Sequence, residues 1–332
     1  MKQINFKILM SLVLLALCLG ACKDKEYAIP TASDELQNDL IKRSLGPNIV
    51  GGTIEFAYAA AILPEKGKLS SMTVEASIAG ATGTYLDNRF FNTNSSGADV
   101  GTAVGDPSVT NGKTTTVNYT IGSLSAATLR YFYKIPEEAR GKSISFTFTA
   151  KSSNGETISY QAGPYEVRSM DMTLDLVAKD GTDCYISIAD MKVYNATFAA
   201  ANPDKIDLVY LYRTPATVTY LHSLVAPTAD PSYWPTFTMP TALKNKTKIV
   251  KAFTVRDQQL SRIQYGVFVD DVDLSSKDFT DAPDFAINVK AEAGVWVQTA
   301  DGRYNAYVYI NSVTNTATVK EMKISIKRLK VR

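Results

Sequence analysis

Much of the chain alternates apolar and polar side chains with a period of two, which is the pattern of β-strands. Clear examples are residues 53–58, 72–78, 116–121 and 143–150. Strict alternation gives each strand one buried and one exposed face, as in the antiparallel sheets of a sandwich. The segments between these strands are too short for helices that could cover a sheet. We therefore expect an all-β fold.

Turn residues divide the strands into pairs. Asn-Gly and Asp-Gly dipeptides supply the positive φ angles of tight hairpins, and they occur at 154–155 and 180–181. They predict two hairpins: 143–150 with 157–160, and 174–177 with 184–188. Short helical turns are expected at 136–140 and 197–201, where they would connect strands.

Two segments of the second half, 205–212 and 263–269, are nearly all apolar at their centres. They predict central strands covered on both faces. Residues 304–310 and 319–326 alternate again and predict a terminal hairpin. The last residues, 327–332, alternate charged and apolar side chains, which favours a charged edge strand that resists unwanted pairing.

The amino terminus has the features of a secretory signal. Lys2 and Lys7 precede an apolar run over 8–19, and the small pair Gly20-Ala21 follows. The run is too short for a good membrane span. The sequence Leu-Gly-Ala-Cys at 19–22 resembles the lipobox of bacterial lipoproteins, in which the cysteine carries the lipid. The resemblance implies cleavage before Cys22 and attachment through it.

The predicted domains follow from these patterns. Residues 1–21 form the signal, 22–45 a lipidated tether, and 46–168 and 169–332 two immunoglobulin-like antiparallel β-sandwiches. A short helical pattern through Leu36, Leu40 and Ile41 lies within the tether. The Lys-Asp-Lys-Glu segment after Cys22 resembles the signal that sends lipoproteins of Bacteroidetes to the cell surface, although Lys25 separates the two acids.

The charge balance limits the partners. Of the 35 basic residues, Lys2 and Lys7 leave with the signal, and 33 then balance the 33 acidic residues. A neutral chain lacks the basic field that phosphate backbones require, so nucleic acid is not expected as a partner. Attachment to the outer membrane then depends on the lipid, because no polybasic face is available.

Candidates for chemistry are few. His222 is the single histidine and has no nucleophile motif to serve, so no catalytic residue is assigned. Cys184 is the one cysteine left after the signal and Cys22, and its apolar surroundings favour a buried core residue. One histidine and one thiol exclude a typical zinc site.

An acidic stretch begins at Asp270. Asp271 and Asp273 start like an EF-hand calcium loop, but Ser276 replaces the required glycine and Ala282 the closing glutamate. A solvated acidic loop is the favoured interpretation, with no cofactor. Calcium near Asp271 and Asp273 stays open as an alternative.

Two aromatic segments are the candidate ligand or partner surface. Tyr233, Trp234 and Phe237 lie between prolines in a long connection from about residue 215 to 243. Long ordered loops often carry binding sites, although such rings also pin a loop to its own domain. Arg89, Phe90 and Phe91, in the loop-like stretch 80–106, form the second candidate.

Residues 131–142 and 202–212 resemble a family of two-domain Bacteroidetes lipoproteins of unknown function. Proteins of this kind are often encoded beside starch-utilisation-type importers. The resemblance implies a non-enzymatic, outer-membrane surface lipoprotein that binds a glycan or oligopeptide, or docks on the importer barrel and its lid lipoprotein.

Two other hypotheses remain. A pilin-like or adhesive lipoprotein would release a first strand by cleavage after a basic residue, and Arg43 is the position for it. A surface hydrolase would need a deep cleft holding two carboxylates with raised pKa values.

Overall fold

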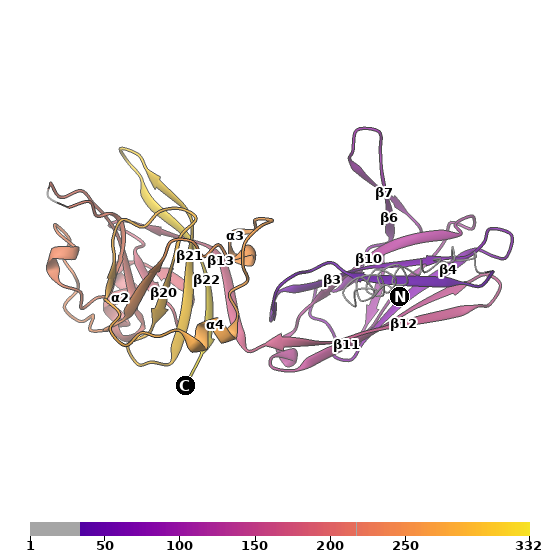
Figure 1. Ribbon diagram of the computed structural model, residues 1–332, viewed down its shortest axis with the longest axis horizontal. Helices are drawn as coiled ribbons and strands as arrows, with labels where there is room; N and C mark the ends of the chain where they lie inside the picture. Colours follow the sequence, from indigo (N-terminus) through magenta and orange to yellow (C-terminus); the bar gives the residue numbers. More distant parts are fainter. Residues whose placement is uncertain (1–33, 217) are drawn as a thin grey trace, which may run out of the picture. The chain divides into compact units, whose positions relative to one another are not determined.

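The computed structural model describes residues 34–216 and 218–332. Almost all of its regular structure is β-sheet, which confirms the all-β prediction. The chain moves from one pair of sheets to another between β12, which ends at Arg168, and β13, which begins at Met170 (Figure 1). In the part of the chain that is described, no helix is both long and apolar enough to cross a bilayer.

The first sandwich consists of two sheets. The first has the order β1 (Gln37–Lys42), β3 (Thr53–Ala61), β10 (Ala126–Lys134), β5 (Tyr85–Leu86). The second has the order β2 (Asn48–Ile49), β12 (Thr157–Arg168), β11 (Ser143–Ser152), β4 (Leu69–Ala76), β9 (Thr114–Asn118), β8 (Val109–Asn111). All pairs are antiparallel except β2 with β12.

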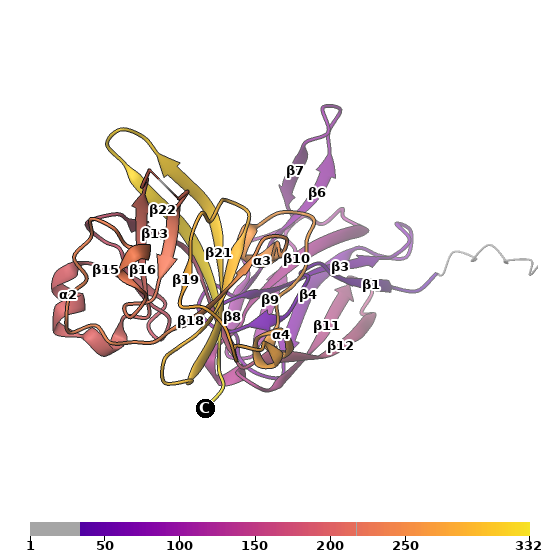
Figure 2. The same cartoon turned by 60° about the vertical axis from the view of Figure 1, so that its left-hand side comes forward.

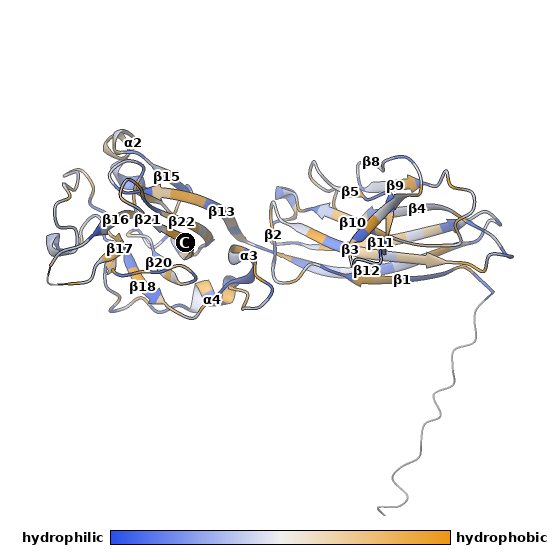
Figure 3. Ribbon diagram, turned by 90° about the horizontal axis from the view of Figure 1, so that it is seen from above, coloured by the Kyte–Doolittle hydropathy of each residue, from blue (hydrophilic) through white to orange (hydrophobic). Residues whose placement is uncertain are grey.

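The core of this sandwich is rich in aromatic rings. Phe56 lies edge-on to Phe146 and Phe148, with ring centroids 5.0 and 5.1 Å away. These residues occupy alternate positions on β3 and β11, so the period of two in the sequence turns all of them toward the same interior. Figure 3 colours the strands by hydropathy. The connection to β11 includes the short 3₁₀ helix η1 (Glu137–Ala139).

A two-stranded ribbon projects from the first sandwich. It consists of β6 (Arg89–Thr93) and β7 (Asp99–Ala103), which pair with each other and, among the described residues, with no other strand (Figure 2). The stretch 80–106, expected to be a loop, therefore contains regular β-structure. Every residue of β7 is exposed, so this strand has no buried face that its sequence could have revealed.

The second pair of sheets contains the rest of the chain. One sheet has the order β13 (Met170–Lys179), β22 (Lys320–Lys330), β21 (Tyr304–Asn315), β20 (Gly294–Gln298), β18 (Lys248–Ala252). The other has the order β15 (Lys192–Tyr194), β14 (Tyr185–Ser187), β16 (Leu208–Arg213), β17 (Leu221–Val225), β19 (Phe285–Ala286). The connections contain α2 (Ala196–Ala201), η2 (Pro203–Lys205), η3 (Pro231–Tyr233), α3 (Gln258–Ser261) and α4 (Asp271–Ser276).

Several strand predictions are confirmed. The hairpin around Gly155 joins β11 to β12, and the terminal hairpin joins β21 to β22. Residues 208–211 of β16 are fully buried, as expected for a central strand. The helical turns at 136–140 and 197–201 correspond to η1 and α2.

Four predictions are wrong. Residues 37–42, assigned to the tether, form edge strand β1. The turn at Gly181 exists, but β13 and β14 on either side of it belong to different sheets. Residues 263–269 form no strand: Ile263, Tyr265 and Val267 are exposed, and Val269 is the residue of this segment that packs against a sheet. Strand β22 lies between β13 and β21, so 327–332 does not supply an edge strand.

Candidate functional site

The outer face of the first sheet is unusually smooth at one end. Strand β3 turns the side chains of Ala57, Ala59 and Ala61 to this face, opposite the buried Phe56 and Tyr58. Directly opposed residues of three strands form two rows there: Asp39, Ala59 and Thr128 in one, and Gln37, Ala61 and Ala126 in the other. Opposed side chains on one face are close neighbours, so the methyl groups form a flat floor between larger polar groups.

The β6–β7 ribbon makes a wall beside this floor. Phe90, Phe91 and Asn92 of β6 line a shallow cavity of about 430 Å³ together with residues of the floor. We call this cavity the alanine groove: its floor is Ala59, Ala61, Ala126 and Thr128, and its walls are Gln37 and Asp39 on one side and Phe90, Phe91 and Asn92 on the other. Its volume lies within the range of about 300–1,000 Å³ that is usual for small-ligand sites.

The Phe91 ring is held by two arginines. The guanidinium carbon of Arg130 lies 4.1 Å from the ring centroid and that of Arg89 lies 5.3 Å away, both within the range of cation–π contacts. Gly101 is directly opposite Phe91 in the ribbon. A Cβ at Gly101 would lie 2.9 Å from the ring, so the missing side chain leaves room for Phe91.

Each of these arginines has a carboxylate partner. Arg89 pairs with Asp87 at 2.8 Å, and Arg130 pairs with Asp99 at 3.2 Å. The hydrogen bond from Arg89 is the main reason that the pKa of Asp87 lies below its usual value. The two positive charges beside the groove are therefore largely compensated.

Asp39 differs from these acids. Its side chain is exposed, and its Oδ1 accepts a hydrogen bond from the backbone N–H of Leu40 at 2.8 Å. Among residues 34–216 and 218–332, no cation forms an ion pair with Asp39. Asp39 thus supplies an uncompensated acceptor on one wall of the alanine groove.

The other aromatic segment packs against its own domain. Tyr233 stacks on Phe285 with 3.6 Å between ring centroids, and the indole N–H of Trp234 donates to the carbonyl of Ala229 at 3.0 Å. Both rings and Phe237 are partly buried against the core of the second sandwich. The six predicted surface residues therefore belong to two sandwiches, and only Phe90 and Phe91 line the alanine groove, with Arg89 beside them.

A second cavity, of about 520 Å³, lies in the second sandwich and is lined by Asp190, Asp207 and Asp301 among others. Burial raises the pKa of Asp207 to about 7. Burial acts in the same direction on Asp190 and Asp301, but hydrogen bonds, including those from Lys205 and Arg303 respectively, outweigh it and leave both pKa values lowered. The hydrolase hypothesis needs two carboxylates with raised pKa values in one cleft, and this cavity supplies one.

The acidic stretch begins a helix instead of forming a solvated loop. Asp270 caps α4 by accepting from the backbone N–H groups of Val272 and Asp273, and the Asp273 side chain accepts from the N–H of Asp270. Carboxylates are favourable at a helix N-terminus, which explains their number here. Asp271 lies 3.6 Å from Arg168. Within the described ranges, no group of three metal-ligating side chains is present.

His222 and Cys184 are interior residues of the second sandwich. His222 Nδ1 lies 2.8 Å from the Tyr210 hydroxyl, and burial lowers the pKa of His222. Burial raises the pKa of the Cys184 thiol to about 12. Cys22, the predicted lipid site, lies outside the described residues.

Comparison with family models divides the chain into two parts. Residues 33–167 match the domain of unknown function DUF4466, and residues 168–331 match the domain of unknown function DUF8576. No curated protein matches the chain.

A DUF4466 family protein from Parabacteroides merdae has a similar crystal structure. It is 43% identical, the match covers 90% of this chain and 100% of that one, and the TM-score is 0.83. The major pilin subunit of Bacillus cereus is 9% identical with a TM-score of 0.28, covering 86% of this chain and 66% of its own. That TM-score is too low to support an argument.

Proposed function

The chain belongs to the DUF4466 family, whose function is unknown, and we propose that it is a lipid-anchored surface protein that captures a ligand in the alanine groove. The observation that carries this proposal is the groove itself. It brings an aromatic wall, a flat apolar floor and the uncompensated carboxylate of Asp39 into one cavity. An apolar cavity with a few convergent polar groups is the usual form of a small-ligand site.

In this proposal the protein performs no catalysis. It is an accessory component of an outer-membrane nutrient importer and presents a glycan or oligopeptide to the importer barrel and its lid lipoprotein. The lipid on Cys22 holds it on the outer face of the outer membrane. The relative from a Parabacteroides species supports the bacterial setting, since that genus belongs to the Bacteroidetes.

The test combines capture of partners with capture of ligands. The lipidated protein, tagged at its carboxyl terminus, is purified from intact outer membranes, and we expect a large barrel protein to copurify.

The soluble Cys22→Ser chain is then screened against glycans and peptides, with Phe91→Ala as the groove variant. Phe253→Ala is the matched control, because Phe253 is an exposed ring of the second sandwich. If no ligand depends on Phe91, the groove is not a binding site.

Strand β1 favours a second candidate, the pilin-like subunit. This edge strand pairs with β3 over residues 37–42 and ends directly before Arg43, where cleavage was predicted. Arg43 is tied to the fold by its N–H, which donates to the Glu55 carbonyl at 2.7 Å, and by an ion pair with the Glu55 side chain. Cleavage there would uncover the edge of β3.

The two candidates differ in the mature amino terminus. Under the leading proposal the protein isolated from cells begins at a lipidated Cys22, as measured by mass spectrometry. A chain that begins at Ser44 and runs as ladders on gels would instead establish the pilin-like subunit.

A further inference from the structure

We infer that the alanine groove takes a neutral saccharide. This inference rests on the proposed function and adds the class of ligand. It follows from the charges around the groove, from the shape of its floor and walls, and from the hydrogen bonds already made along the edge of β1.

The charges disfavour an anionic ligand. Such a ligand would meet the carboxylate of Asp39, with which no cation of the described residues forms an ion pair. The guanidinium groups of Arg89 and Arg130 lie against Phe91 and already have carboxylate partners, so they do not offset this repulsion. A neutral ligand avoids this cost.

The shape suits a ring with one apolar face. The methyl groups of Ala59, Ala61 and Ala126 provide a flat floor, and Phe90 and Phe91 of β6 line its side, with Phe90 also packed against the core of the first sandwich. The face of a pyranose that presents C–H groups is apolar and can lie on this methyl floor. The guanidinium groups of Arg89 and Arg130 already contact the Phe91 ring, so Phe91 would border the ligand at the side of the floor.

The polar groups suit the hydroxyls of the same ring. The carboxylate of Asp39 accepts hydrogen bonds, Asn92 both donates and accepts, and Thr128 adds a hydroxyl. After its bond to the Leu40 N–H, Asp39 keeps lone pairs for two neighbouring sugar hydroxyls. Acceptors and donors on opposite walls match the two roles that every sugar hydroxyl can take.

An extended peptide is a poorer match. Peptides usually add to a free sheet edge through main-chain hydrogen bonds, and β1 is the edge strand beside the groove. Two backbone donors at this edge region are already bonded to carboxylates: the N–H of Leu40 to Asp39 at 2.8 Å, and the N–H of Leu36 to Glu156 at 2.6 Å. A peptide strand would have to displace them.

The experiment uses the full mature chain with Cys22→Ser and an array of neutral glycans, acidic glycans and peptides. Binding of each positive probe is then measured by calorimetry. We expect neutral glycans to bind, and Asp39→Asn and Phe91→Ala each to weaken binding about tenfold or more. Gly101→Ala keeps the Phe91 ring but pushes it from its place, and it should weaken binding as well. Asp106→Asn and Phe253→Ala are the matched controls, and thermal melting verifies that each variant is folded.

The outcomes separate this inference from the proposed function. Groove-dependent binding of neutral glycans supports both. If peptides or acidic glycans bind and the binding depends on Asp39 or Phe91, the ligand class is wrong while capture in the groove stands. Binding that is unchanged in all three groove variants, or absent for every probe, overturns both.

Discussion

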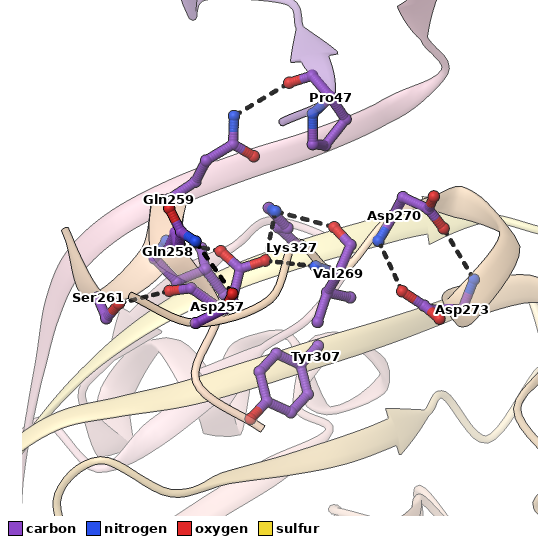
Figure 4. Close-up of polar contacts among 12 residues, drawn as sticks. Pro47, Asp257, Gln258, Gln259, Ser261, Val269, Asp270, Asp273, Tyr307 and Lys327 are labelled. Atoms are coloured by element: carbon purple, nitrogen blue, oxygen red, sulfur yellow. Dashed lines mark hydrogen bonds and ion pairs between the residues drawn. The ribbon is translucent and has the colours of Figure 1, made fainter. Parts of the chain in front are cut away.

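The ammonium group of Lys327 lies 2.6 Å from the carboxylate of Asp257, and both side chains are fully buried (Figure 4). Lys327 also donates to the carbonyl of Val269, and Asp257 accepts from the backbone N–H groups of Val269 and Leu260. The pair joins Asp257 and Val269 to the outer face of the sheet that contains β22. The ammonium group and the carboxylate thus each have backbone hydrogen-bond partners besides one another, as a buried ion pair requires.

Removing one member of this pair should be costly. Lys327→Met leaves the Asp257 carboxylate buried without its cation, and we expect a loss of about 3–5 kcal/mol in the free energy of unfolding. Urea unfolding of the soluble Cys22→Ser chain measures the loss. Lys323→Met is the control, because Lys323 lies on the same strand and is only partly buried.

A double variant separates the charge from the packing. Asp257→Asn combined with Lys327→Met removes both charges and should recover part of the loss. If Lys327→Met costs no more than the control, the pair does not hold Asp257 and Val269 in place.

This pair also explains one error of the sequence analysis. The apolar run 263–269 looks like a buried strand, and Val269 is indeed buried. Its burial comes from packing on the outer face of a sheet, through an aspartate and a lysine that are 70 residues apart in sequence. Ile263, Tyr265 and Val267 of the same run are exposed, so the apolar run indicated neither which side chains are buried nor what Val269 packs against. For the same reason Lys327 was expected on an exposed edge.

The stability of the second sandwich should depend on pH through Asp207. The native state holds a proton there up to about pH 7, whereas the unfolded chain releases it near the ordinary value of 3.8. The proton on Asp207 therefore adds to the free energy of unfolding. This stabilisation is fully present at low pH and is lost as the pH rises toward 7, at up to about 1.4 kcal/mol per pH unit.

Asp207→Asn should flatten this decline. Melting temperatures measured from pH 5 to pH 8 should fall less in the variant than in the parent chain. Asp204→Asn, at a neighbouring exposed carboxylate, should keep the parent's profile. Parallel profiles for Asp207→Asn and its parent would show that Asp207 is ionised throughout this range.

Cys184 should be unreactive in the folded protein. Its thiol is buried, and a pKa of about 12 leaves almost no thiolate at pH 8. In the soluble Cys22→Ser chain it is the one cysteine after residue 21. We expect no reaction with dithiobis-nitrobenzoate until denaturant is added, and then one equivalent. Rapid labelling of the native chain would show that the site opens.

Anchoring through Cys22 is tested by fractionation. Cys22→Ser removes the thiol that would carry the lipid and should release a folded protein into the soluble fraction, while the parent chain stays with the membrane. Circular dichroism of the released protein checks that the sheets are intact. Retention of the variant in the membrane would mean that another part of the chain binds there.

Sequence patterns located two residues of the alanine groove. Phe90 and Phe91 stood out as neighbouring rings in a polar stretch, and the structure places both in the groove. Asp39 was missed because its segment was assigned to the tether. Its role depends on the register of β1 against β3, which places it opposite Ala59, and register is a property of two strands. The alternating alanines at 57, 59 and 61 were a signal that could have marked the floor.

The pairing of β1 has a mechanical consequence. With 37–42 inside the sheet, only the fourteen residues 23–36 separate Cys22 from the first strand, and a fully extended chain of that length reaches at most roughly 50 Å. Tension on a membrane anchor would enter the sandwich at Leu36 and Gln37 and load the hydrogen bonds between β1 and β3 first. Gln37 and Asp39 also line the alanine groove, so a pull from the bilayer would act on a strand that forms part of the groove.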